Sequence, residues 1–89
     1  MAGVMNPIER LWCKYALEVL REVGAGLPEK PWLDQVSRML PRPLASLERK
    51  RIVWILAEDR EWVESFRNSL TGEICYSVTE AGRTVSYGL

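Results

Sequence analysis

The side chains that most often carry catalysis or bind metal ions are few in this chain of 89 residues. It has no histidine, and its two cysteines, Cys13 and Cys75, lie in unrelated contexts without CxxC spacing. Zinc sites and Ser-His-Asp or Cys-His catalytic sets need several such groups together. Carboxylates such as Glu58 and Asp59 have no base or nucleophile beside them in the sequence. We therefore expect no enzymatic activity, no metal site and no cofactor.

The cysteines and the longest apolar run indicate where such a chain works. We expect Cys13 and Cys75 to be small buried thiols in a reducing compartment, with a disulfide as the minority alternative. The longest apolar run covers residues 52–57, which is far too short to cross a bilayer. The N-terminal residues also lack the apolar core of a signal peptide. We therefore expect a cytoplasmic protein.

The charges are balanced overall but unevenly distributed. The 12 basic and 12 acidic residues give a net charge of zero, which weighs against nucleic acid as a partner because positive charge drives phosphate binding. Residues 30–60, however, hold seven basic and four acidic side chains, whereas acidic residues are in excess on both sides of this segment. Any contact with nucleic acid should therefore fall in the middle of the chain.

The length and a hydrophobic content of 47% are typical of one small folded domain, which we expect to span residues 1–89. Apolar residues that recur every three or four positions predict helices over about 7–23, 31–40 and 43–58. The first helix should begin at Asn6 as its cap, with Pro7 in the first position and Glu9 reaching back. Gly24 should end it, because glycine readily adopts the left-handed conformation of a C-cap.

The third helix can begin at either Pro43 or Ser46, after a turn that two prolines restrict. We expect five residues of this segment to face inward: Leu44, Leu47, Ile52, Ile55 and Leu56. We also expect the four tryptophans to serve mainly as core residues, because each can bury a large area. They are Trp12, Trp32, Trp54 and Trp62.

From Glu61 onward the apolar pattern changes to a period of two, which predicts antiparallel strands over about 61–67 and 74–79. The polar loop between them, with Gly72 near its end, predicts a hairpin tip. Thr79 can cap a short helical turn. The predicted fold class is therefore α+β, with three helices, a β-hairpin and a short C-terminal helical turn.

One stretch of the predicted second strand and turn resembles a known family. The sequence Tyr76-Ser77-Val78-Thr79-Glu80-Ala81-Gly82-Arg83 is similar to the Tyr-x-Leu-Thr-Glu-x-Gly-Arg stretch after the wing of PadR-like and MarR-like transcriptional regulators, with valine in place of leucine. Residues 51–64 likewise resemble the end of a recognition helix, a turn and the first wing strand. The resemblance implies a winged helix-turn-helix domain that regulates transcription by binding DNA. Its Thr79 should act as a cap, its Gly82 should allow a close approach, and its Arg83 should lie near the strand pair.

In such a domain the helix over 43–58 would lie in the major groove of duplex DNA, with its N-terminal residues facing the bases. We expect Ser46, Arg49 and Lys50 to stand opposite its apolar side and to contact base edges or phosphates. Arg51 projects nearer the inward side, so we expect it to bind phosphate or to form an internal salt bridge. The competing interpretation of residues 49–51 is a solvated helix face, for which Glu48 could serve as an ion partner.

Other residues are expected to anchor the DNA backbone. Lys30, Arg38 and Arg42 lie on or beside the preceding helix and turn, where phosphates would pass. In the wing, Arg67 is the one basic residue, and Asn68 and Thr71 can form hydrogen bonds to phosphates. We expect about four to six phosphate contacts at most, and a clear loss of binding as salt rises.

The expected partner is therefore double-stranded DNA, bound by a homodimer because a domain this small buries little surface alone. Helix 8–23 is the candidate dimer surface, since its Trp12 and Tyr15 could extend across an interface, although they could equally complete the core of one domain. The alternative function is a winged-helix protein–protein interaction module or complex subunit without DNA binding. Zero net charge and an acidic wing favour that alternative.

Overall fold

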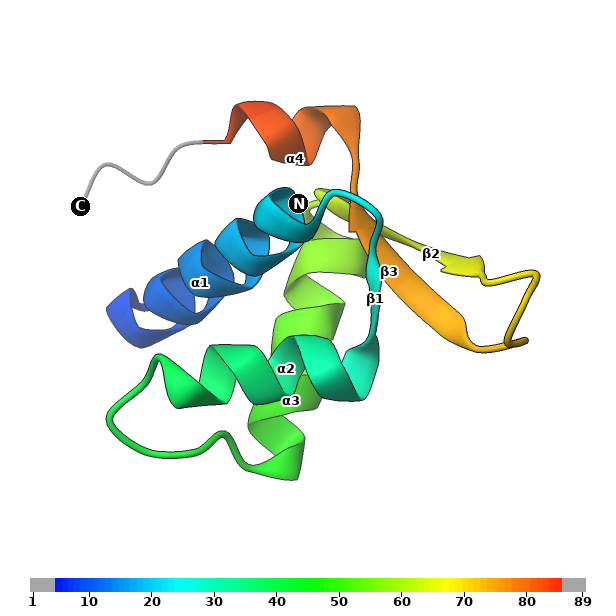
Figure 1. The fold of residues 1–89 in the computed structure, drawn as a ribbon. Helices are drawn as coiled ribbons and strands as arrows, with labels where there is room; N and C mark the ends of the chain where they lie inside the picture. The colour runs from blue at the N-terminus through cyan, green and yellow to red at the C-terminus, as the bar shows by residue number, and fades with distance from the viewer. Residues whose placement is uncertain (1–4, 86–89) are drawn as a thin grey trace.

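The computed structural model describes residues 5–85 and shows an α+β fold (Figure 1). Helices gather around one core, and a β-hairpin extends from them. In chain order the elements are α1 (Pro7–Val23), β1 (Leu27–Pro28), α2 (Glu29–Arg38), α3 (Ser46–Val53), η1 (Trp54–Asp59), β2 (Val63–Arg67), β3 (Ile74–Val78) and α4 (Glu80–Thr84).

Helix α1 begins and ends where the sequence predicts. The Oδ1 of Asn6 accepts a hydrogen bond from the Glu9 backbone N–H at 2.8 Å, and the Asn6 N–H donates to Oε1 of Glu9 at 3.2 Å. This reciprocal pair satisfies two backbone donors that the helix itself leaves free. Gly24 ends the helix with a φ of 77°. The predicted span of 7–23 is therefore confirmed.

Helices α2 and α3 differ from their predicted bounds. Helix α2 begins at Glu29 rather than at 31, because Pro31 falls within the first turn, where the missing N–H would have no helical partner anyway. It ends at Arg38, two residues before the predicted 40. Helix α3 begins at Ser46, so of the two predicted starts Pro43 is wrong. The reason is that the Leu44 N–H donates to Oγ of Ser37 at 2.9 Å, which holds the turn outside the helix.

The third helix continues without a break into a π-helical segment, η1, which the sequence does not predict. A π-helix is defined by hydrogen bonds to the carbonyl five residues earlier, and the Arg60 N–H at the end of η1 donates in this way to Ile55 at 2.8 Å. The helical backbone therefore runs to Asp59, one residue beyond the predicted end.

The sheet has three antiparallel strands in the order β1-β3-β2, whereas the sequence predicts only the last two (Figure 1). Strand β1 pairs Leu27 with Tyr76 of β3. It was expected to be loop because two residues are too few to show a period. Gly26 permits this pairing, because a Cβ there would lie 2.9 Å from the Tyr76 carbonyl oxygen.

The predicted hairpin of β2 and β3 is confirmed, with Val63 opposite Val78 and Arg67 opposite Ile74. Both strands are shorter than predicted. Strand β2 begins at Val63 rather than 61, because Glu61 has a φ of 56° and turns the chain. Strand β3 ends at Val78 because Thr79 caps α4, with its Oγ1 accepting from the Gly82 N–H at 3.1 Å.

The core lies between α1, α2, the third helix and one face of the hairpin. Trp32 is fully buried at its centre, where its indole N–H donates to the Ala16 carbonyl at 2.9 Å and its ring lies 5.4 Å from that of Tyr76. Two predicted core residues of the third helix are instead exposed, Leu47 by 79% and Trp54 by 47%. At about 100° per residue, these two lie some 140° and 200° around the helix from the buried Ile52.

Candidate nucleic-acid interface

The outward side of the third helix is the surface where the sequence places DNA contacts. Five exposed residues between positions 46 and 54 lie about 100° or more around the helix axis from the buried Ile52, if each residue turns the helix by about 100°. We call this group the solvent face of α3: Ser46, Leu47, Lys50, Arg51 and Trp54. All five are exposed. Ser46 and Lys50 stand one turn apart near the helix N-terminus. Neither side chain forms a hydrogen bond or ion pair within residues 5–85.

Arg49 does not belong to this face, contrary to the expected arrangement. It lies only about 60° from Ile52 around the helix, so it points toward α2. Its guanidinium contacts Oδ1 of Asp34 at 2.8 Å and Oγ of Ser37 at 3.5 Å, and its side chain is 25% exposed. Lys30, a predicted phosphate anchor, binds the other Asp34 oxygen at 2.8 Å. Hydrogen bonds from Lys30 and then Arg49 hold the pKa of the Asp34 carboxyl below its ordinary value. The Arg49–Asp34 pair joins α3 to α2, whereas the Lys30–Asp34 pair lies within α2.

Arg42, another predicted anchor, is also paired. Its two terminal nitrogens donate to the two Glu48 oxygens at 3.1 and 2.7 Å, a fork that fits a carboxylate well. Glu48 in turn accepts from the Ala45 N–H at 2.7 Å, which completes the start of α3. The hydrogen bonds from Arg42 and Ala45 lower the pKa of Glu48. Arg42 therefore links the turn before α3 to Glu48 in the first turn of that helix.

Arg51 forms the internal salt bridge that was one of its two expected roles. Its Nε lies 2.8 Å from Oε2 of Glu9, the capping residue of α1, and its guanidinium lies 5.1 Å from the Trp54 ring centroid. The hydrogen bond from Arg51 is the main reason that the pKa of Glu9 is lowered. One carboxylate thus joins the first turn of α1 to the third helix.

Arg38 is the predicted anchor without such a partner. It lies at the end of α2, is exposed, and makes no hydrogen bond or ion pair with the residues that the structure describes. Together with Lys50 it provides the unneutralised positive charge on the α2–α3 side of the molecule.

The predicted wing residues mainly shape the hairpin tip. Arg67 donates to the Gly72 carbonyl at 2.9 Å, and Oδ1 of Asn68 accepts from the N–H groups of Leu70 and Thr71 at 2.8 and 3.2 Å. The hydroxyl of Thr71 accepts from the Glu73 N–H at 3.2 Å. The tip is therefore an ordered turn, and its most prominent side chain is Leu70, which is 94% exposed.

The cysteines are buried free thiols, as expected, and no disulfide joins them. Burial raises the pKa of the Cys13 thiol to about 12, so this group stays protonated and unreactive. Among residues 5–85, no group of three or more cysteine or acidic residues could hold a metal ion. No helix in the same range is long and apolar enough to cross a membrane.

The sequence reasoning missed the apolar part of the solvent face. Leu47 and Trp54 were assigned to the core because they are apolar, although their angle around the helix from Ile52 already places them outside. Their angle from the apolar stretch 52–57 is the sequence signal that indicates their exposure.

Comparison with known proteins gives no relative for this chain: no protein-family model, no curated protein and no solved structure matches it.

Proposed function

We propose that this chain is a winged helix-turn-helix domain that binds duplex DNA as a transcriptional regulator, with α3 in the major groove. The order of elements supports this: helix, short strand, two helices joined by a turn, strand, hairpin tip and strand. In the proposed domain α2 and α3 form the helix-turn-helix, and residues 63–78 form the wing.

The observation that carries the DNA proposal is the pair of Ser46 and Lys50. Both are exposed, lie one turn apart at the start of α3, and have side chains without a hydrogen-bond or ion-pair partner among residues 5–85. This is the part of a recognition helix that meets base edges, where a hydroxyl or an ammonium can bond to bases or phosphates. Arg38 would add a phosphate contact from α2.

The ion pairs of the helix-turn-helix limit the expected affinity. Lys30, Arg42 and Arg49 are occupied by Asp34 and Glu48, so a phosphate would have to compete with a carboxylate for each of them. We therefore expect about two to four phosphate contacts per domain, and a shallow dependence of affinity on salt. That number is smaller than the sequence alone predicts.

Fluorescence anisotropy of a labelled random-sequence duplex tests the proposal at low and moderate salt. Wild type should bind, and Lys50→Gln should weaken binding and reduce the salt slope by about one. The matched control is Arg83→Gln, which removes one exposed positive charge from α4, an element remote from the start of α3 in Figure 1. Absence of salt-dependent binding by folded wild type, or equal losses in both variants, would contradict the proposal.

A second candidate function is a protein-interaction module, and the exposed apolar side chains favour it. Leu47 and Trp54 occur two turns apart on the solvent face of α3, with exposed fractions of 79% and 47%. Large apolar and aromatic side chains at helical spacing are typical anchors for a protein partner.

Variants of Leu47 and Lys50 distinguish the two candidate functions. If the chain is an interaction module, Leu47→Gln should abolish a stable complex isolated from the source cells, while Lys50→Gln should leave that complex intact. If it binds DNA, Lys50→Gln should have the larger effect on the affinity for duplex.

We further propose that the domain acts as a homodimer through α1. Ile8 is 60% exposed and borders an apolar groove of about 290 Å³ between α1 and the turn before α3. Further residues that line it are Leu11, Trp12, Leu40, Pro41 and Leu44, together with the ion-paired Arg42 and Glu48.

A further inference from the structure

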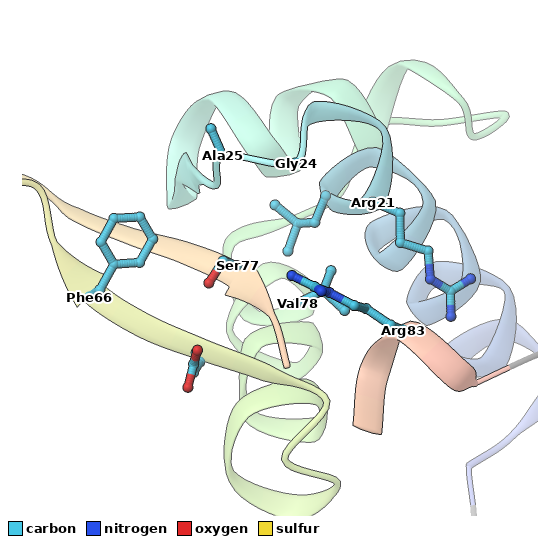
Figure 2. Close-up of a pocket in the computed structure, with 9 residues that line it drawn as sticks. Arg21, Gly24, Ala25, Phe66, Ser77, Val78 and Arg83 are labelled. Carbon is cyan, nitrogen blue, oxygen red and sulfur yellow. The ribbon is translucent and has the colours of Figure 1, made fainter. Parts of the chain in front are cut away.

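A second concave surface lies on the other side of the sheet, away from the solvent face of α3. It is an open cleft of about 510 Å³, which is within the usual size range of small-molecule sites. The end of α1, the hairpin and α4 form its walls (Figure 2). Its lining residues are Leu20, Arg21, Gly24, Ala25, Glu64, Phe66, Ser77, Val78 and Arg83.

Two arginines border this cleft, and within the described residues 5–85 only Arg21 forms hydrogen bonds. Arg21 donates to the carbonyl oxygens of Gly82, at 2.6 Å, and of Val85, so it fastens α4 to α1. Figure 2 shows its guanidinium turned away from the cleft, whereas that of Arg83 points across the cleft toward Val78. The Arg83 side chain is exposed and has no hydrogen bond or ion pair within residues 5–85. A free guanidinium fork thus lies over the cleft.

Polar groups of the hairpin stand on the opposite wall. Glu64 and Ser77 are directly opposite each other in the β2–β3 pair, so their side chains share one face of the sheet. Neither side chain makes a hydrogen bond or ion pair with the part of the chain described. Counted over residues 5–85, the cleft therefore offers one cation, one anion and one hydroxyl that have no partner.

The rest of the lining is apolar. Leu20 and Val78 are buried at the base of the cleft. The Phe66 ring stands at its rim against Gly26, where an added Cβ would lie 2.8 Å from the ring edge. Ligand sites commonly combine such an apolar surface with a few polar groups that fix orientation.

We propose that this cleft binds a small organic carboxylate with an apolar body and with an ammonium or hydroxyl donor beside the carboxylate. The carboxylate would pair with the fork of Arg83, the apolar body would cover Leu20 and Phe66, and the donor would face Glu64. The Glu64 carboxylate disfavours ligands that carry only negative charge, such as inorganic phosphate. This site does not depend on whether α3 binds DNA.

An NMR titration of the isotope-labelled chain with L-phenylalanine tests the proposal. The amides of Ser77, Val78 and Arg83 should shift and saturate at millimolar ligand. Phenethylamine, which lacks the carboxylate, and inorganic phosphate should bind at least about tenfold more weakly. Phenylacetate, which lacks the ammonium, should also bind more weakly than phenylalanine.

Variants assign the contacts. Arg83→Gln should weaken phenylalanine binding by about tenfold or more, and Arg83→Lys should restore part of it because a point charge lacks the fork. Arg38→Gln, which removes an equally exposed arginine from α2, should bind as wild type. Glu64→Gln should abolish the preference for phenylalanine over phenylacetate.

Three results would overturn the proposal. One is the absence of saturable shifts up to about 10 mM phenylalanine, because the proposal expects a Kd in the millimolar range. Another is unchanged affinity in a folded Arg83→Gln variant, and the third is equal binding of phenethylamine. None of these outcomes affects the DNA proposal, because that proposal is tested by the affinity of wild type and Lys50→Gln for duplex DNA.

Discussion

At the scale of single residues, most charges of the basic middle segment stabilise the fold. Asp34, Glu48 and Glu9 each accept an arginine from another element or from the adjoining turn. Arg49 and Arg51 are ion-paired, but with Asp34 and Glu9 rather than with the expected Glu48, while Lys50 between them has no partner within residues 5–85. Neighbours in sequence have different roles here because each step along a helix turns the side chain by about 100°.

These pairs predict how stability depends on pH. Because the pKa values of Glu9, Asp34 and Glu48 are lower in the folded chain than their ordinary values of 4.5, 3.8 and 4.5, the pairs stabilise the fold above that range. Their contribution is lost as pH falls through the lowered values. Urea unfolding followed from pH 7 to pH 2 should show stability falling below about pH 4.5.

The variant Glu48→Gln identifies one source of this loss. It should be less stable than wild type at pH 7 and should lose less stability on acidification, because it has one carboxylate fewer to protonate. Glu22→Gln on α1, which removes an exposed acid without an ion pair in the described range, is the control and should follow wild type. If Glu48→Gln and wild type lost equal amounts of stability on acidification, this account would be contradicted.

At the scale of elements, close backbone contacts and the hydrogen bonds from Arg21 hold the C-terminal part in place. Helix α4 packs on the turn before β2, where Thr79 N–H donates to the Trp62 carbonyl at 2.9 Å and its hydroxyl donates to the Glu61 carbonyl at 2.8 Å. Gly82 is buried against the same carbonyl of Trp62. The motif that carries the family resemblance thus supplies a cap and a close contact, as expected.

We expect Gly82→Ala to destabilise the chain strongly. An added Cβ would collide with the Trp62 carbonyl oxygen and would lie 2.8 Å from Cγ1 of Val78, and backbone atoms cannot move aside cheaply. The cost should exceed about 2 kcal/mol in urea unfolding. Gly24→Ala is the matched control: its Cβ would meet open space, so only its positive φ of 77° adds a cost, of about 1 kcal/mol. Similar losses in the two variants would refute the packing argument.

Local signals explain which elements could be predicted from the sequence. The start of α1, the cap at Thr79 and the hairpin depend on residues a few positions apart, so the sequence predicts them well. Strand β1 depends on Tyr76, far along the chain, and η1 depends on how the helix end meets β2. The sequence predicts Lys50, Arg38, Arg49 and Arg42 alike as DNA contacts. It does not show that the last two are ion-paired, because those pairs form only when α2, its turn and α3 pack together.

At the scale of the whole molecule, the surface divides into three regions with different chemistry. The solvent face of α3 mixes positive and apolar groups, the groove beside Ile8 is apolar, and the cleft beside Arg83 is mixed polar and apolar. In the proposals made above, duplex DNA, a second copy of the chain and a small molecule would each contact a different one of these surfaces.

The proposed dimer can be tested at this scale. Wild type should sediment as twice the mass of the 10.2 kDa chain, and Ile8→Glu should sediment as a monomer, because a charge would be buried in an apolar interface. Val23→Glu is the control, since Val23 is 41% exposed on the same helix but lies at its other end, away from the groove. A monomeric wild type at high micromolar concentration, or dissociation by both variants, would argue against α1 as the dimer surface.

The half-exposed indole of Trp54 also gives the chain a built-in optical reporter. Trp32 is sealed in the core, so a soluble quencher such as acrylamide should reach Trp54 readily and Trp32 hardly at all. Whatever covers the solvent face of α3, whether a DNA groove or a protein surface, must shield this indole. Because the partly buried Trp12 and Trp62 also emit, the signal of Trp54 is read as the difference between wild type and Trp54→Phe. Protection of that signal would report occupation of the solvent face of α3 without any label, whereas a ligand confined to the cleft beside Arg83 would leave it unchanged.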